Sequence, residues 1–506
     1  MGTCNINSNR RAKAIMVQGT MSNAGKSLLC TGLCRIFRQD GYKVAPFKSQ
    51  NMALNSAITG EGLEMGRAQY VQAEAAGIEP SVLMNPILLK PVTNMGSQLI
   101  VCGEVRGNYE ASEYFRMKHE LVPEIQAAYD KLAEKNDIIV IEGAGSPAEI
   151  NLSKGDFANM GMAKMAHAPV ILTGDIDRGG VFAQLYGTVK LLPEDEQDII
   201  KALVINKFRG DVSLLGSGLD MIKDLTGKPV AGVVPMMDVD IDDEDSLSSR
   251  LTRQKRSALI DVVVIRLPKI SNFTDLAPLE ATGGVGVRYI TSPGEIGAPD
   301  LIVIPGTKST ISDLKWMRAS GIEAAIKKLS SLGTPVIGIC GGYQMLGEKI
   351  TDREGAEGGG SIRGMELLPV VTEFEPEKHR TRTSGEFLEV SGIFSSLTGK
   401  HLTGYEIHMG RTVLKEGGSP LIRLESGEIM GCQKGSVYGS YLHGFFDSAE
   451  CRREIIDDIA KHKGIDFFPE AFNWHDYKEE QYDKLAYGLR ASLDMDMIYR
   501  IIENGI

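Results

Sequence analysis

Cysteine, positive charge and long apolar runs are all scarce in this sequence. Its 506 residues include seven cysteines, whose irregular spacing forms neither a disulfide framework nor a zinc-binding pattern. No segment approaches the roughly 18–20 uninterrupted apolar residues that cross a membrane. Residues 1–11 are polar and lack the apolar core of a secretory signal. These absences predict a protein of the reducing cytoplasm that has no membrane partner.

Acidic residues outnumber basic ones, and the formal net charge is -11. A general nucleic-acid binder normally carries a basic face or stripe, so we expect no nucleic-acid partner. The charge balance does not exclude a small anionic substrate, because a few Lys and Arg side chains can gather locally in an acidic protein.

Short β-branched segments alternate with helical stretches, which is typical of parallel α/β folds. The expected strands are Ala14–Gln18, Ile138–Ile141, Val170–Thr173 and Ala202–Ile205 in the first half, then Ile260–Ile265, Leu301–Ile304, Val336–Ile339 and Ser436–Tyr441. The length predicts two to four domains. Functional groups in such folds collect at the carboxyl ends of the strands.

An acidic run followed by Ser-rich and basic residues interrupts this pattern between 236 and 258. We therefore expect a first α/β domain over 1–235, a linker over 236–258, a second α/β domain over 259–450 and a helical extension over 451–506. The Gly-rich segment Gly355–Gly360 is predicted to be a turn.

A phosphate loop follows the first strand, in the order Gly19-Thr-Met-Ser-Asn-Ala-Gly25-Lys26-Ser27. A Gly-rich turn before a helix directs several backbone N–H groups and the helix dipole at one point, which suits phosphate. Lys26 is expected to reach the β- and γ-phosphates of ATP, and Ser27 to ligate Mg²⁺. Five residues separate Gly19 from Gly25, one more than in the plain Walker A motif. The predicted ATP site therefore consists of Gly19, Thr20, Gly25, Lys26 and Ser27.

Polar residues at the ends of later strands fit the same site. Glu142 is predicted to be a Mg²⁺ ligand, because this cation prefers oxygen, although a helix N-cap or a solvated turn residue would also explain it. Asp175 and Asp177, with Arg178 beside them, would orient a substrate or a metal, or would form a structural ion pair. Asn206 is similar to the Asn that contacts the base in related nucleotide folds.

A second motif surrounds Cys340, in Val336-Ile-Gly-Ile-Cys340-Gly-Gly-Tyr. Gly338 and Gly342 permit a sharp turn between strand and helix that exposes a nucleophile. The backbone N–H of Gly341 falls where an oxyanion donor is needed, and Gly306 in an earlier turn is the candidate second donor. The alternative is a buried structural cysteine.

A thiolate nucleophile needs a base, and His443 is the predicted one, with His408 as its main rival. The Cys340 and His443 motifs resemble the class I glutamine amidotransferases, in which Cys attacks the glutamine side-chain amide. In most of that class Glu follows two positions after the His, but here that position is Phe445. This departure predicts a Cys–His dyad, or a third member supplied from elsewhere in the chain.

The variant phosphate loop is similar to those of dethiobiotin synthetase and the cobyrinate amidases. Longer strings then resemble the cobyric acid synthase family. They are Phe47-Lys-Ser-Gln-Asn-Met-Ala-Leu-Asn55, Glu142-Gly-Ala-Gly-Ser-Pro-Ala-Glu-Ile-Asn-Leu152, Asp175-Ile-Asp-Arg-Gly-Gly-Val-Phe182, Arg266-Leu-Pro-Lys-Ile-Ser-Asn-Phe-Thr-Asp275 and Gly404-Tyr-Glu-Ile-His-Met-Gly410. The resemblance implies two doubly wound parallel-sheet domains, one P-loop NTPase-like and one a flavodoxin-like glutaminase.

The resemblance also implies an activity: ATP- and glutamine-dependent amidation of the b, d, e and g carboxylates of adenosylcobyrinic acid a,c-diamide, a corrinoid. The candidates for the acceptor side are Lys48, Gln50, Asn51, Asp175 and Arg178. One alternative is an amidase of the a and c carboxylates of the same macrocycle. Another is a regulatory P-loop ATPase with an inactive glutaminase-like module.

Overall fold

The computed structural model describes residues 12–91, 96–152, 154–242 and 258–506. These residues form two compact units. Unit 1 contains the described residues within 1–52, 65–241 and 478–506, and unit 2 contains those within 53–64 and 242–477. Each unit is therefore assembled from segments that are far apart in the chain.

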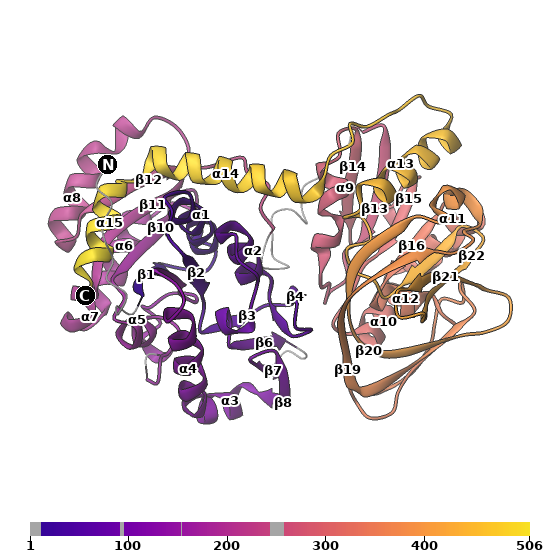
Figure 1. Ribbon diagram of the computed structural model, residues 1–506, viewed down its shortest axis with the longest axis horizontal. Coiled ribbons are helices and arrows are strands. Elements are labelled where there is room, and N and C mark those ends of the chain that lie inside the picture. The colour runs from indigo at the N-terminus through magenta and orange to yellow at the C-terminus, as the bar shows by residue number, and fades with distance from the viewer. Residues whose placement is uncertain (1–11, 92–95, 153, 243–257) are drawn as a thin grey trace. The chain divides into compact units, whose positions relative to one another are not determined.

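Unit 1 is built on a six-stranded parallel sheet with the order β12-β11-β10-β1-β9-β2 (Figure 1). The strands are β1 Lys13–Gly19, β2 Val44–Phe47, β9 Ile138–Glu142, β10 Val170–Asp175, β11 Ile200–Phe208 and β12 Val230–Pro235. The central strands are apolar on both faces, as expected of a sheet covered by helices on both sides. Their parallel direction brings the ends of β1, β9 and β10 to one edge.

A smaller four-stranded sheet in unit 1 has the order β3-β6-β7-β8. Its strands are β3 Gln50–Met52, β6 Ile87–Pro91, β7 Gly96–Val101 and β8 Glu104–Glu110. The helices of the unit are α1 Lys26–Gln39, α2 Arg67–Ala76, α3 Ala111–Met117, α4 Val122–Ala133, α5 Met160–Ala166, α6 Val181–Leu191, α7 Glu194–Ile199, α8 Gly216–Thr226 and α15 Met495–Asn504.

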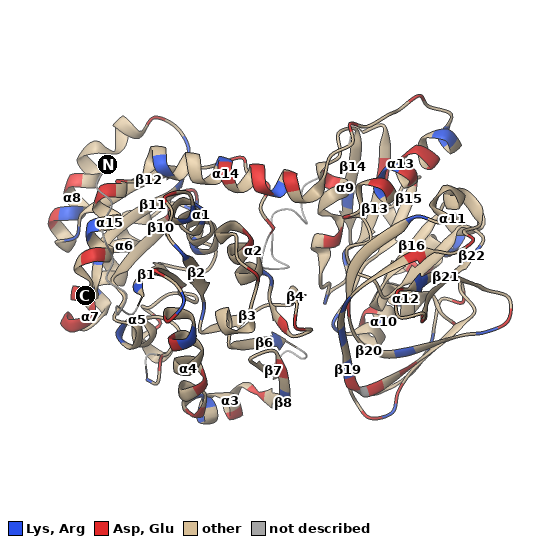
Figure 2. Ribbon diagram, viewed as in Figure 1, with Lys and Arg blue, Asp and Glu red and all other residues tan. Residues whose placement is uncertain are grey.

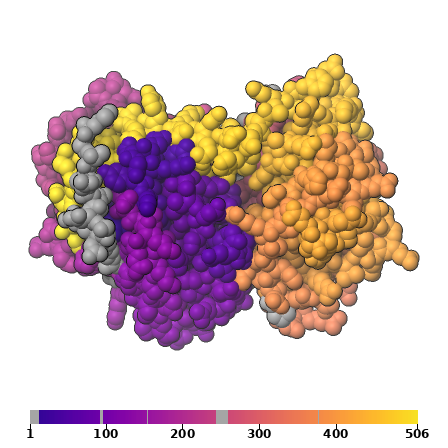
Figure 3. All heavy atoms as spheres, in the orientation of Figure 1, coloured from indigo at the N-terminus to yellow at the C-terminus, as the bar shows by residue number. Residues whose placement is uncertain are grey.

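The end of the chain completes the core of unit 1. Helix α14, Trp474–Ser492, enters the unit at residue 478, and its apolar side chains pack with those of α1 and α15. Figure 3 shows the yellow C-terminal residues directly against the indigo residues of the N-terminal segment. Gly32 marks the closest approach, because a Cβ there would lie 2.2 Å from Cδ1 of Leu489.

Unit 2 contains an eleven-stranded mixed sheet, ordered β14-β13-β15-β16-β23-β22-β21-β19-β17-β18, with β20 paired to β19. The strands are β13 Ile260–Ile265, β14 Val285–Ile290, β15 Leu301–Ile304, β16 Val336–Ile339, β17 Lys349–Asp352, β18 Gly360–Arg363, β19 Val370–Phe387, β20 His401–Leu414, β21 Ser419–Leu424, β22 Ile429–Lys434 and β23 Val437–Ser440. The part from β14 to β23 is parallel, and most of the remaining pairs are antiparallel. Figure 2 shows basic residues along the long strand β19.

The helices of unit 2 are α9 Ala277–Ala281, α10 Thr310–Ser320, α11 Ile322–Ser331, α12 Gly341–Leu346 and α13 Ala449–Lys463. A hairpin from the first part of the chain also belongs to this unit, through β4 Ser56–Ile58 and the start of β5 Glu64–Gly66. One large apolar cluster unites the parallel strands with α10, α12 and α13.

The predicted α/β class is confirmed, and each of the eight expected strands is present. The compact units differ from the linear ranges expected from the sequence, because residues 53–64 join unit 2 and residues 478–506 join unit 1. Residues 243–257 of the expected linker lie outside the described residues. Gly355–Gly360 forms a turn whose backbone N–H groups bind the carboxylate of Asp352.

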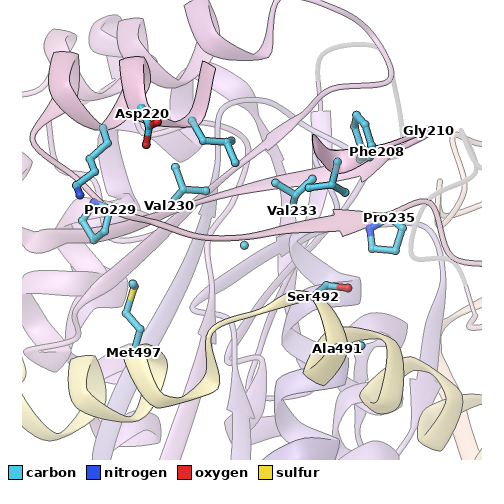
Figure 4. Close-up of a pocket in the computed structure, with 14 residues that line it drawn as sticks. Phe208, Gly210, Asp220, Pro229, Val230, Val233, Pro235, Ala491, Ser492 and Met497 are labelled. Carbon is cyan, nitrogen blue, oxygen red and sulfur yellow. The ribbon is translucent and has the colours of Figure 1, made fainter. Parts of the chain in front are cut away.

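A cavity of about 590 Å³ lies along the edge strand β12 (Figure 4). Apolar side chains line most of it, with Asp220 from α8 on one side and Met497 from α15 on the other. None of the predicted site residues lines it. None of the helices in the described part of the chain combines the length and apolar character needed to cross a membrane.

The packing of α14 on α1 predicts the effect of truncating Leu489, which is fully buried. Leu489→Ala should lower the free energy of unfolding of unit 1 by about 2–5 kcal/mol, through lost apolar contact and the remaining cavity. Tyr487→Ala on the same helix is the matched control, because that side chain is 78% exposed. Urea unfolding followed by circular dichroism tests this, and equal transitions in the two variants would contradict it.

Candidate functional site

The phosphate loop connects β1 to α1 at the carboxyl edge of the unit 1 sheet. Gly25 adopts a left-handed conformation with φ of 92°, and a Cβ there would lie 2.0 Å from Nδ2 of Asn206. The Asn206 amide donates a hydrogen bond of 3.0 Å to the carbonyl of Ala24, and the Thr20 N–H donates to Thr173. The structure therefore brings Gly19, Thr20, Gly25 and Asn206 together, with Asn206 supporting the loop.

The two side chains at the start of α1 point into this loop. Lys26 Nζ donates hydrogen bonds of 3.0 Å to the carbonyls of Met21 and Gly145. Ser27 Oγ donates to Glu142 Oε1 at 2.8 Å. The predicted phosphate-binding Lys and the two predicted metal ligands thus lie side by side at the ends of β1 and β9.

Glu142 is buried and surrounded by donors. Lys48 Nζ lies 2.9 Å from Oε1, and the side-chain amides of Gln72 and Gln69 donate to Oε2 at 2.6 and 3.3 Å. Burial alone would raise the pKa of Glu142, but Lys48, with help from Gln72 and Ser27, outweighs it and lowers the pKa. The carboxylate is therefore held in its charged form.

Gln69 and Gln72 were not predicted from the sequence. They lie three positions apart on α2 and therefore share one helix face, which is the only signal that marks them. Asn51 reaches the same cluster, because its amide donates to Gln69 at 3.1 Å. Gln50 instead accepts a hydrogen bond from the hydroxyl of Tyr114.

Asp175 and Arg178 are less closely joined than the sequence suggested. Asp175 is buried, and its nearest cation is Lys207, at 2.9 Å. The Arg178 guanidinium lies 3.8 Å away, and its side chain is 58% exposed. Asp177 pairs with Arg209. The structure places the pair at the end of β10, with Lys207 as an additional partner.

Cys340 occupies a sharp turn between β16 and α12. Its backbone adopts φ of 53° and ψ of -108°, which is strained for a residue with a side chain. A Cβ on Gly342 would lie 1.9 Å from the carbonyl oxygen of Ile304, so only glycine fits there. The thiol, 8% exposed, donates to the carbonyl of Ile407 at 3.6 Å.

Of the two predicted oxyanion residues, Gly341 directly follows Cys340 at the start of α12, and Gly306 lies in the loop after β15. A Cβ on Gly341 would lie 3.1 Å from the backbone nitrogen of Thr307, and one on Gly306 would lie 3.2 Å from Cε1 of His443. Thr307 donates to the buried carboxylate of Asp313 at 2.5 Å. Burial raises the pKa of Asp313 to about 6.

A buried carboxylate holds His443. Asp275 Oδ2 lies 2.7 Å from His443 Nδ1, and Asp275 Oδ1 accepts from the N–H of Gly444 at 3.1 Å. The ring of Tyr405 stacks on the imidazole at 5.0 Å between centroids. Burial alone would lower the pKa of His443, but Asp275, and then Cys340, outweigh it and raise the pKa to about 10.

Asp275, far from His443 in the chain, therefore lies where a third group would be expected. Phe445 packs in the core against Phe387 and Phe446, so its position carries no polar partner. His408 has both ring nitrogens engaged, with Glu406 at 3.1 Å and the carbonyl of Gly410 at 2.8 Å. Because both nitrogens of His408 already have partners, His443 is the better candidate for the base.

Two family models match the chain, and each covers one of the two centres described above. Residues 15–247 match the CobQ/CobB/MinD/ParA nucleotide binding domain. Residues 261–451 match the CobB/CobQ-like glutamine amidotransferase domain. A nucleotide-binding domain joined to such a domain defines a glutamine-dependent amidating ligase.

The particular family follows from relatives that match almost end to end. Cobyric acid synthase of Ruminiclostridium cellulolyticum is 58% identical over 98% of both chains. That of Lachnoclostridium phytofermentans is 57% identical over 98% of this chain and all of the relative, and that of Salmonella typhimurium is 47% identical over 97% and 98%. The chain belongs to the cobyric acid synthase family.

The Asp275–His443 pair predicts a pH-dependent stability. Because the pKa of His443 rises from its ordinary 6.5 to about 10, the pair stabilises the fold fully below pH 6.5, and this contribution is lost as pH rises through about 10. Asp275→Asn should therefore lower the denaturation midpoint most near pH 6, with a margin that shrinks toward pH 10.

Urea unfolding at several pH values measures this margin. His475→Gln is the control, because His475 is exposed and lies outside the pair. A difference between wild type and Asp275→Asn that stayed constant from pH 6 to pH 10 would contradict the assignment.

Proposed function

We propose that this protein uses ATP and glutamine to amidate the b, d, e and g carboxylates of adenosylcobyrinic acid a,c-diamide, giving adenosylcobyric acid. The observation that carries the proposal is the 58% identity to a cobyric acid synthase over 98% of both chains. The two centres described above supply the two half-reactions that such an amidation needs.

Cys340 and His443 are proposed to release ammonia from glutamine. His443 takes the thiol proton of Cys340, and the resulting thiolate attacks the side-chain amide carbon. The imidazolium then gives this proton to the departing nitrogen. The N–H groups of Gly306 and Gly341 would stabilise the oxyanion of the tetrahedral intermediate. Water then hydrolyses the thioester, releasing glutamate and regenerating the thiol. Asp275 keeps His443 in the orientation that the first step uses and stabilises the imidazolium that this step forms.

The phosphate loop is proposed to activate the acceptor. A carboxylate is a poor target for ammonia because its negative charge repels nucleophiles and oxide is a poor leaving group. Attack of the carboxylate on the γ-phosphorus of ATP forms an acyl phosphate and releases ADP. Ammonia then displaces phosphate to form the amide. Lys26 would stabilise charge on the transferred group, while Thr20 and the loop N–H groups hold the phosphates.

The donor set at the loop fits Mg²⁺. Within the described residues, no group of three or more His, Cys, Asp or Glu side chains is placed to hold a metal ion. Mg²⁺ bound to ATP, however, needs only one or two protein oxygens. Ser27 Oγ and Glu142 Oε1, 2.8 Å apart, would hold it. Gln72 Oε1 is buried there with no hydrogen-bond partner among the described groups, and suits a metal-bound water. The ion would neutralise charge on the β- and γ-phosphates.

Lys48 and Asn51 are the stronger candidates for the acceptor side, because they belong to the cluster around Glu142. Gln50 at the start of β3, Asp175 at the end of β10 and Arg178 just after it complete the proposed set. A cytoplasmic location is also proposed, because the six cysteines in the described part of the chain are free thiols, as a reducing compartment would keep them. The partners of the protein are then small molecules, the corrinoid and glutamine.

The first test is to incubate the purified protein with the diamide, ATP, Mg²⁺ and glutamine and to follow the corrinoid by mass spectrometry. We expect four successive replacements of OH by NH₂. If the diamide is unchanged while the a and c carboxylates of cobyrinic acid react, the protein is an a,c-amidase. ATP hydrolysis without amidation of either corrinoid would favour a regulatory ATPase.

Two substitutions separate the half-reactions. Cys340→Ala should abolish glutamine-supported amidation and retain ammonia-supported amidation, because only the nitrogen source is lost. Lys26→Ala should abolish amidation with either nitrogen source, because the carboxylate is no longer activated. Glutamate release and amide formation, measured separately, distinguish the two. Survival of glutamine-supported turnover in Cys340→Ala would overturn the role of that residue.

A further inference from the structure

The hairpin 53–64 belongs to unit 2 although the residues on both sides of it belong to unit 1. Strand β4 pairs with β5, and Thr59 closes the turn by accepting from Gly62 and donating to Leu63. Most of its side chains are buried, including Asn55, Ser56 and Glu64 at 1% exposure each. A connection of this length would ordinarily lie on the surface, so its burial calls for a reason.

Charged groups of β19 fix the far part of this hairpin. Lys378 forms an ion pair with the buried carboxylate of Glu64, which also accepts from Ser56 Oγ at 2.8 Å. Arg382 Nε donates to the carbonyl of Ile58 at 3.0 Å. A buried ion pair is costly to break, so the hairpin is held in one place on unit 2.

Two asparagines join the start of the hairpin to the glutaminase centre. The backbone N–H of Asn272 donates to Asn55 Oδ1 at 2.8 Å, and Asn272 Oδ1 accepts from the N–H of Ser56 at 3.4 Å. Both side chains are buried. Asn272 adopts a left-handed conformation with φ of 52°, a conformation that Asn tolerates better than most residues.

Asn272 begins the short 3₁₀ turn Phe273–Leu276, which carries Asp275. The N–H of Asp275 donates to the carbonyl of Asn272 at 3.1 Å. The turn is therefore fixed at its first residue by Asn55 and presents the carboxylate to His443 three residues later. In the described structure, the same short segment binds the hairpin through Asn272 and orients the base through Asp275.

We propose that Asn55 is a positioning residue of the glutaminase, acting through Asn272 on the Asp275–His443 pair. This inference rests on the proposed function of Cys340 and His443. Asn55 touches neither the thiol nor the imidazole in the contacts described above. It sets the position of the carboxylate, and a displacement of about 1 Å at such a distance from the chemistry can lower a rate a hundredfold.

The groups that face His443 make this effect measurable by pH. They are Asp275 from the 3₁₀ turn, Cys340 from the start of α12 and the ring of Tyr405 from β20. Burial favours the neutral imidazole, and Asp275 opposes it more strongly than Cys340 does. If the carboxylate moves away, His443 loses its proton at a lower pH. The alkaline limb of glutaminase activity should then move to lower pH.

The experiment compares four variants of the full-length protein. Asn55→Ala removes the oxygen that accepts from Asn272. Asn55→Asp keeps an accepting oxygen there. Asn272→Gly keeps the left-handed backbone and the N–H that donates to Asn55, and removes the side chain that accepts from Ser56. Glu61→Ala is the matched control, because Glu61 lies exposed at the tip of the same hairpin.

Glutamate release from glutamine is measured as a function of pH, beside ammonia-supported amidation of the diamide. For Asn55→Ala we expect kcat for glutamine to fall about ten- to a hundredfold with little change in KM, and the alkaline limb to move to lower pH. Ammonia-supported amidation should stay at the wild-type level. Asn55→Asp should recover part of the loss, and Asn272→Gly should show a smaller loss in the same direction.

Other outcomes would contradict the proposal. Wild-type kcat and pH profile in both Asn55→Ala and Asn272→Gly would overturn the positioning role. So would a parallel fall of the glutamine- and ammonia-supported reactions, which indicates a general loss of structure. If Asn55→Ala is insoluble, Asn55→Leu, which is similar in size to Asn and also lacks the accepting oxygen, is measured in its place. Failure of the wild-type protein to hydrolyse glutamine would refute the proposed function itself.

Discussion

A buried carboxylate needs hydrogen-bond donors or a cation beside it. Each unit of this protein has a carboxylate of this kind at its proposed reaction centre. In unit 1 it is Glu142, which receives hydrogen bonds from Ser27, Lys48, Gln69 and Gln72. In unit 2 it is Asp275, which meets His443 and the N–H of Gly444. An uncompensated charge at either place would be strongly destabilising, so these partners are fixed as firmly as the apolar core.

The two carboxylates serve opposite ends of the proposed reaction. The pKa of Glu142 is lowered, which keeps it available as an anion beside the phosphate loop. Asp275 raises the pKa of its partner, which stabilises the imidazolium that His443 forms when it takes the proton of Cys340. In both units the reactive side chain stands at the end of a parallel strand, and its compensating groups come from helices, turns or loops elsewhere in the chain.

The sequence predicts the strands and the positions at their ends, because these depend on local patterns. A buried strand followed by a glycine-rich turn marks both Gly25 and Cys340, and the positive φ at each position explains why such a turn is needed. The partners of these residues depend on the order of strands in the sheet, which no local pattern encodes. Asp275 lies 168 residues before His443 in the chain, and no local pattern connects the two. From the sequence, Phe445 shows only that the usual Glu is missing, and does not indicate which residue contacts His443 instead. The roles of the predicted site residues remain predictions.

The C-terminal helices have a consequence for the order in which the protein folds during synthesis. Leu489, Ile498 and Ile502 belong to the same core cluster as β1 and α1, which are translated several hundred residues earlier. Domains made early generally fold early, but the core of unit 1 remains incomplete until α14 and α15 have been translated. Residues 242–477, which form most of unit 2, emerge before those helices. The nucleotide-binding half, although translated first, is therefore the last to be completed.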